Sequence, residues 1–122
     1  MRFLLVHHVR EEGPGEPAYR ACDEELLRRW LDEVRARGVR VEGSRLRPTS
    51  EGASVRVSDG RRLVSEGPFA ESAEQIAGYD LIECDDLADA VDVASRHPTT
   101  RIGRIEVRPL LVRADTIEPV VD

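Results

Sequence analysis

Two adjacent histidines, His7 and His8, are the side chains in this sequence that are best suited to proton transfer near neutral pH. They end an apolar run that predicts a β-strand, in which successive side chains point to opposite faces. We therefore expect one histidine to face a layer of helices and the other to face a cavity, as a possible acid or base. The competing interpretation is that each is a hydrogen-bonded packing residue.

Glu83 is the carboxylate that we expect to act with such a histidine. It shares a predicted strand face with Tyr79 and Leu81, whereas Asp80 and Ile82 lie on the opposite face. If the face of Tyr79 lines a cavity, Glu83 becomes the best candidate for a buried acid. The catalytic hypothesis therefore combines His7 or His8 with Glu83.

A Gly-Pro-Phe turn that ends in Phe69 is flanked by two more carboxylates, Glu66 and Glu71. Beside a cavity, such a pair could hold a cation or share acid/base work, so the candidate ligand-binding residues are Glu66, Phe69, Glu71 and Tyr79. A structural interpretation is favoured. The glycine and proline set the backbone angles, the phenylalanine fills the core, and the glutamates accept hydrogen bonds from loop amides.

Composition and missing motifs exclude several functions. The net charge of −6 disfavours nucleic-acid binding, and the absence of lysine removes both a Schiff-base lysine and a P-loop. The histidines are scattered and no HExxH or CxxC occurs, so we expect no metal and no cofactor. No apolar run is long enough to span a membrane. We expect a cytoplasmic protein with free thiols and no membrane partner.

Hydrophobic periodicity and turn residues predict four long strands, two helices and a hairpin around Asp59-Gly60. One helix carries an apolar stripe of Leu27, Trp30, Leu31 and Val34, and the other a stripe of Leu87, Ala90, Val91 and Ala94. His97 is expected to cap the second helix as a cation favoured by the helix dipole. The expected elements are the strand 2–9, the helix 19–37, the strand 39–46, the hairpin strands 53–58 and 61–65, a helical turn at 72–75, the strand 78–84, the helix from Asp85 or Asp86 to Arg96, and the strand 102–112.

This order of elements predicts an α+β fold, a ferredoxin-like split βαβ with an added β-hairpin and with both helices on one face of the sheet. The strands carry apolar residues on both faces, so the second face also needs a cover. A second copy of the chain is the simplest one, which predicts a homodimer.

The segment 65–79 closely resembles the signature of the DGPF branch of the YCII-related family, and the resemblance extends over roughly residues 1–111. It implies a dimeric α/β-barrel, in which two ferredoxin-like sheets pack face to face around a cavity. The signature's first Asp is Glu66 here and its usual Lys is Ala73. Better-studied relatives carry a His–Asp pair whose histidine lies early in the first helix. Residues 19–24 contain no histidine, so that chemistry is not carried over.

We expect one domain over residues 1–113 and a C-terminal tail over 114–122. The first functional hypothesis is a cytosolic homodimer that binds a small molecule or a protein partner, with no nucleic-acid partner. The alternative is an isomerase- or hydrolase-like enzyme that uses acid/base chemistry in the barrel cavity. A weaker alternative, implied by the resemblance, is a regulatory accessory of an alternative sigma factor.

Overall fold

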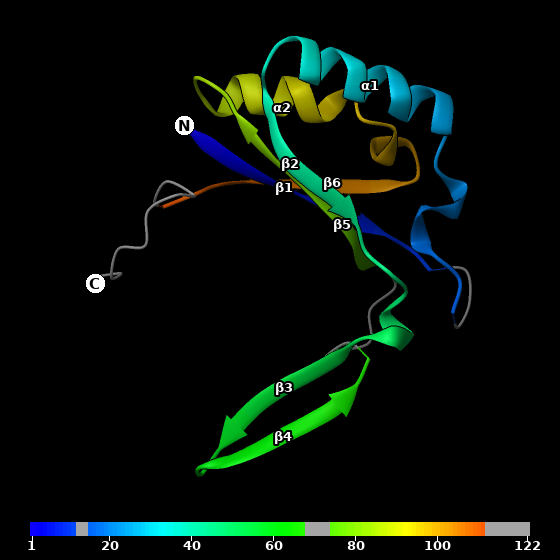
Figure 1. Ribbon diagram of the computed structural model, residues 1–122, viewed down its shortest axis with the longest axis vertical. Helices are drawn as coiled ribbons and strands as arrows, with labels where there is room; N and C mark the ends of the chain where they lie inside the picture. The colour runs from blue at the N-terminus through cyan, green and yellow to red at the C-terminus, as the bar shows by residue number, and fades with distance from the viewer. Residues whose placement is uncertain (12–14, 68–73, 112–122) are drawn as a thin grey trace.

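The computed structural model describes residues 1–11, 15–67 and 74–111, and it shows two helices packed on one face of a four-stranded antiparallel sheet (Figure 1). The sheet has the order β2-β5-β1-β6, which is the strand order of a ferredoxin-like split βαβ and confirms the predicted fold class. The elements are β1 (Arg2–Val9), α1 (Glu24–Ala36), β2 (Arg40–Arg45), β3 (Ala53–Ser58), β4 (Arg61–Glu66), β5 (Gln75–Glu83), α2 (Leu87–Ser95) and β6 (Gly103–Pro109).

The first helix starts later than the sequence predicts. Residues Ala18–Ala21 form a separate 3-10 turn, and α1 begins only at Glu24. The reason is Asp23, whose carboxylate accepts hydrogen bonds from the backbone N–H groups of Glu25 and Leu26 at 3.0 and 3.1 Å. An aspartate in this N-cap role fixes the start of a helix, because it satisfies amides that have no intrahelical partner.

The hydrophobic core lies between the helices and the sheet. In β1 the burial alternates strictly, so that Phe3 and Leu5 face the helices and are fully buried. The predicted stripe of α1 is confirmed, since Trp30 and Val34 are buried and Leu27 and Leu31 pack against them.

The predicted stripe of α2 is partly wrong. Leu87 and Val91 are exposed, whereas Val93 is buried together with Ala90 and Ala94. Trp30 decides this rotation: its indole Nε1–H donates a hydrogen bond to the Val93 carbonyl at 2.9 Å, which ties the two helices together. A buried indole N–H needs such a partner.

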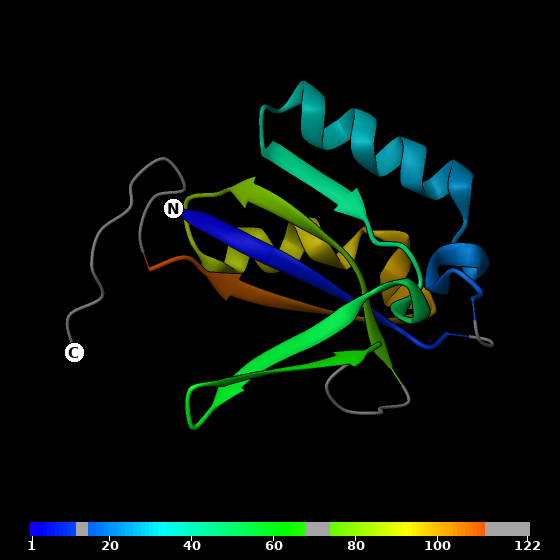
Figure 2. The same cartoon turned by 60° about the horizontal axis from the view of Figure 1, so that its bottom comes forward.

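The hairpin β3–β4 stands apart from the main sheet (Figures 1 and 2). Its predicted two-residue turn is confirmed, because Asp59 and Gly60 have positive φ angles of 52° and 73°, as a type I′ turn requires. Val55 and Val64 pair across the ladder, and both are exposed.

The face of the sheet opposite the helices carries an apolar centre. Leu4 pairs with Leu81, and Val6 pairs with Tyr79, while charged side chains of β6 lie around this centre. None of the helices in the described residues is long and apolar enough to cross a membrane.

Two other expected boundaries are corrected. The strand β5 begins at Gln75 rather than at Gly78, so the predicted helical turn does not extend to Gln75. The strand β6 ends at Pro109, before the predicted limit at Val112. Residues Ser72 and Ala73 and the predicted C-terminal tail lie outside the described residues.

Candidate active site

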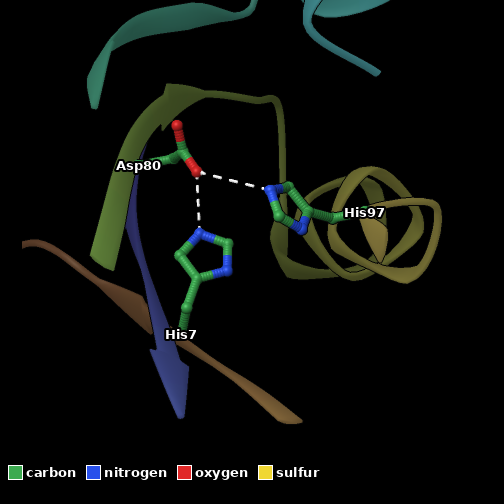
Figure 3. A group of neighbouring side chains, drawn as sticks. All are labelled: His7, Asp80 and His97. Carbon is green, nitrogen blue, oxygen red and sulfur yellow. Dashed lines mark hydrogen bonds and ion pairs between the residues drawn. The ribbon is translucent and has the colours of Figure 1, made fainter. Parts of the chain in front are cut away.

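A buried histidine–aspartate pair lies between the sheet and the helices. His7 comes from β1 and Asp80 from β5, and the His7 Nε2 atom is 2.7 Å from the Asp80 Oδ2 atom (Figure 3). The side chains are only 6% and 8% exposed. His97, which lies between α2 and the following 3-10 turn, brings its Nε2 atom to 4.0 Å from the same oxygen. Residues far apart in the sequence thus form one polar cluster in an otherwise apolar layer.

A local irregularity of the sheet lies beside this cluster. In the β1–β5 ladder, His7 pairs with Gly78 and His8 pairs with Ile76, so that Ala77 has no partner opposite it. This β-bulge shifts the register between His7 and His8. Bulges of this kind often occur next to active sites, where they redirect side chains.

Arg40, the first residue of β2, completes the hydrogen bonding of Asp80. Its Nε–H donates to the Asp80 Oδ1 atom at 2.9 Å, so each carboxylate oxygen has one strong donor. Gly43 makes this arrangement possible. A Cβ atom there would overlap the Asp80 carboxylate and would lie 2.6 Å from the Arg40 Nη2 atom. Because no other residue leaves this space free, Gly43 is part of the site.

His97 is held as a neutral imidazole. Its Nδ1 atom accepts a hydrogen bond from the Thr99 backbone N–H at 3.0 Å, which leaves the proton on Nε2. Burial, with a smaller contribution from the neighbouring His7, lowers the pKa of His97 to about 3, and Asp80 opposes the shift. The expected role as a cationic cap of α2 is therefore wrong. His97 caps the next turn, and it does so without charge.

The tautomer of His7 follows from its contact with Asp80. A distance of 2.7 Å to a carboxylate oxygen indicates that Nε2 carries the proton and donates it. The other nitrogen, Nδ1, then has a free lone pair. It is closed off from solvent and has no hydrogen-bond partner among the described residues. Figure 3 shows this nitrogen on the side of the ring that points away from Asp80.

The aromatic surroundings fix the histidine rings. The ring centroids of His7 and His97 are 4.3 Å apart, and the ring of His97 meets Trp30 edge-on at 4.6 Å. These contacts leave the rings little freedom to reorient, so the cluster is preorganised.

A pocket of about 100 Å³ opens at this cluster. One part of its lining is polar, and another part is formed by aliphatic side chains from β1, α1 and the segment before β6. The residues that line it are His7, Val9, Tyr19, Cys22, Leu27, Leu31, Arg40, Ser44, Arg45, Ala77, Gly78, Tyr79, Asp80, His97, Thr99 and Ile102. Burial raises the pKa of the Cys22 thiol, which keeps it protonated near neutral pH.

The same three side chains also form a possible metal-ligand set, since their ligand atoms lie within 4.8 Å of one another. The cluster does not form a motif in the sequence, because His7 lies more than 70 positions from both Asp80 and His97. The hydrogen bonding opposes a metal, however. The lone pair of His97 is on Nδ1, where it accepts the hydrogen bond from the Thr99 N–H. Nε2 carries the proton of the neutral imidazole, so it has no lone pair to bind a metal.

The other predicted catalytic residues lie outside this pocket. His8 faces the opposite side of the sheet, where its Nε2 atom is 3.5 Å from Glu106. Glu83 is not a buried acid in this chain. Its side chain is 51% exposed and forms ion pairs with Arg2 at 3.1 Å and with the N-terminal amine at 3.5 Å.

The predicted ligand-binding residues are dispersed. Tyr79 lines the pocket next to Asp80, although the pleat directs its side chain to the other face. Glu66 is exposed at the end of β4 and does not line the pocket. Phe69 and Glu71 lie outside the described residues.

Sequence reasoning missed Asp80, Arg40 and Gly43. One signal was available: Asp80 is a charged residue within the run Tyr79-Asp80-Leu81-Ile82, and a charge on a buried strand needs a partner. The identity of that partner was not accessible, because it depends on the register between β1, β5 and β2.

The fold and the site define a class: an α+β protein of ferredoxin-like topology that encloses a histidine–aspartate pair in a small pocket. The YCII-related domain model matches residues 1–113, and the chain therefore belongs to the YCII-related family. A protein of Rhizobium meliloti (strain 1021) that is described as uncharacterized is 45% identical over 71 residues. That alignment covers 55% of this chain and 56% of the relative, so the chain spans about half the length of the curated relative it matches.

Proposed function

We propose that the pocket binds a small molecule and that His7, oriented by Asp80, performs acid/base chemistry on it, as in an isomerase or a hydrolase. One observation carries this proposal: the 2.7 Å contact between His7 and Asp80 at a pocket that both residues line. The second nitrogen of His7 has no partner in the described residues and is buried, so in this proposal a ligand reaches it through a local opening of the pocket lining. A histidine and a carboxylate that line one pocket are the arrangement that the enzyme hypothesis requires.

In this proposal Asp80 is a positioning residue and His7 is the base. Asp80 accepts a hydrogen bond from the Nε2–H group of His7, holds the ring in one tautomer and stabilises the imidazolium that forms when Nδ1 takes a proton. Arg40 keeps the carboxylate oriented through Oδ1. His97 stays neutral, so it adds no positive charge that would oppose protonation of His7.

The test is the exchange of carbon-bound hydrogen next to a carbonyl group, in D₂O, followed by ¹H NMR over a panel of carbonyl compounds with two to five carbons. We expect the wild-type protein to accelerate exchange of at least one compound. His7→Gln and Asp80→Asn should each lower that rate by roughly a hundredfold or more, the usual contribution of a general base.

His8→Gln is the matched control, because His8 is the next residue on the same strand and faces the other side of the sheet. It should leave the exchange rate unchanged. If the panel shows no acceleration, or if His8→Gln removes the activity while His7→Gln keeps it, the proposal is wrong.

We also propose that the chain forms a homodimer through the sheet face opposite the helices, as expected for the DGPF branch. Support comes from the apolar centre of this face, formed by Leu4, Val6, Tyr79 and Leu81. Size-exclusion chromatography with light scattering should give twice the monomer mass at micromolar concentration. A charged substitution, Val6→Glu, should shift the mass to that of a monomer, and a wild-type monomer would contradict the proposal.

The cytoplasm is the location we propose. Cys22 and Cys84 are both free thiols in the structure, which fits a reducing compartment. Fractionation of cells that produce the tagged protein should recover it with the cytoplasmic marker.

A further inference from the structure

The pocket that holds His7 and Asp80 also contains unused hydrogen-bond donors on Arg40. The Nε–H of Arg40 is committed to Asp80, but no described residue accepts a hydrogen bond from its two Nη groups. The side chain is 17% exposed, so these donors are partly removed from water. A guanidinium presents its donors as a planar fork that matches the two oxygens of a carboxylate.

The hydrogen-bonding groups that line the pocket favour an anionic group. Two guanidinium groups, of Arg40 and Arg45, line it, and Asp80 is the one carboxylate among its lining residues. Glu24 bonds Arg45 at 2.6 Å but does not line the pocket. His97 contributes no charge. The excess of donors over acceptors therefore suits a ligand with a single negative charge.

The size and the apolar side of the pocket limit the rest of the ligand. A volume of about 100 Å³ is small beside the roughly 300–1,000 Å³ of pockets that hold drug-sized ligands, so the ligand must be small. Val9, Leu27, Leu31, Ala77 and Ile102 form the aliphatic part of the lining. A short aliphatic chain can cover this part, whereas a second charged group has no partner there.

We propose that this pocket is a binding site for short-chain aliphatic carboxylates. The Nη groups of Arg40 donate hydrogen bonds to the carboxylate of the ligand, and the aliphatic lining contacts its hydrocarbon part. This inference rests on the proposed function for the choice of pocket and adds the class of molecule. Arg40 then has two roles. Its Nε–H group orients Asp80, and its Nη groups orient the ligand beside His7.

The first experiment uses the wild-type protein alone and needs no variant to fold. Isothermal titration and ¹H–¹⁵N NMR would compare butyrate with butyramide, which has the same shape but no charge, and with inorganic phosphate and octanoate. We expect butyrate to bind about ten- to a hundredfold more tightly than butyramide, as for loss of a charged hydrogen bond. Phosphate and octanoate should bind more weakly than butyrate.

The second experiment locates the site. In a Cys84→Ser background, the remaining thiol, Cys22, lines the pocket, so butyrate should slow its reaction with a thiol reagent. Arg40→Lys keeps the charge but removes the fork, and it should abolish this protection. Arg104→Gln is the control, because Arg104 pairs with Glu74 on the sheet outside the pocket.

The possible results separate the two proposals. If butyramide or phosphate binds as tightly as butyrate, or if Cys22 is not protected, the carboxylate site is refuted. If neutral carbonyl compounds undergo exchange that depends on His7, the proposed function nevertheless stands. If butyrate binds and protects Cys22 but no exchange occurs, the ligand class is supported and the proposed enzyme is refuted.

Discussion

Replacement of His97 by asparagine should flatten the acid dependence of stability. The Asn side-chain oxygen can take the place of Nδ1 and accept the hydrogen bond from the Thr99 backbone N–H. The cap of the 3-10 turn is then kept, while the titrating group is removed. The groups that face His97 are His7 from β1, Asp80 from β5, and Trp30 from α1. Arg40 and Arg45 of β2 add a weaker electrostatic effect.

The direction and size of the effect follow from the pKa of His97. Burial lowers the pKa from 6.5, the value in the unfolded chain, to about 3 in the folded protein. Between these values the unfolded state binds more protons, so this stabilising contribution is complete above pH 6.5 and is lost as the pH falls towards 3. Each pH unit costs about 1.4 kcal/mol in this window. The loss between pH 7.5 and pH 5 is therefore about 2 kcal/mol.

Urea unfolding at a series of pH values from 7.5 to 5 measures this loss. His97→Asn should lower the free energy of unfolding at pH 7.5, because ring contacts with His7 and Trp30 disappear. Its further decrease towards pH 5 should be about 2 kcal/mol smaller than that of the wild type. Other groups that titrate in the same way in both proteins change the two free energies of unfolding equally, so their contribution cancels in this comparison. Parallel pH profiles for the two proteins would refute the assignment of a buried, neutral His97.

Two further predictions concern the same cluster. Gly43→Ala should destabilise the fold by about 1–3 kcal/mol in urea unfolding, the usual cost of overpacking, because its Cβ would collide with the Asp80–Arg40 pair. Gly52→Ala, where the nearest atom would be 3.6 Å away, should have little effect, and equal effects at both positions would contradict this. Zinc should leave the melting temperature unchanged, because His97 has no lone pair free for it; a rise that His97→Asn removes would show that the cluster binds the metal.

The sequence predicted the fold well because its signals are local. The alternation in β1 and the Asp59-Gly60 turn each lie within a few residues, and each formed as expected. The second helix was expected to start at Asp85 or Asp86, and Asp86 is its N-cap. The errors in helix position arose where a side-chain hydrogen bond opposed the helix that the hydrophobic pattern predicts. Asp23 delayed the start of α1, and the hydrogen bond from Trp30 turned α2 so that Val93 rather than Val91 is buried.

The site was predicted only in part, for a physical reason. The pleat of a strand required that His7 and His8 face opposite sides, and the sequence alone established this. Which of the two would meet a carboxylate depended on where the helices pack, and the structure places His7 beneath them.

The choice of Glu83 as the acid rested on the face of Tyr79, whereas the buried carboxylate of β5 is Asp80 on the opposite face.

The sequence by itself therefore determined the elements, the family resemblance and the chemical types available for proton transfer, because these depend on neighbouring residues. Only the tertiary structure decided that His7, Asp80 and His97 share one pocket, since that requires the register of β1 and β5 and the end of α2 to converge. It also decided the neutral state of His97 and the tautomer of His7. An imidazole's tautomer is set by the groups it meets across the fold, which for His7 lie 73 positions away in the chain.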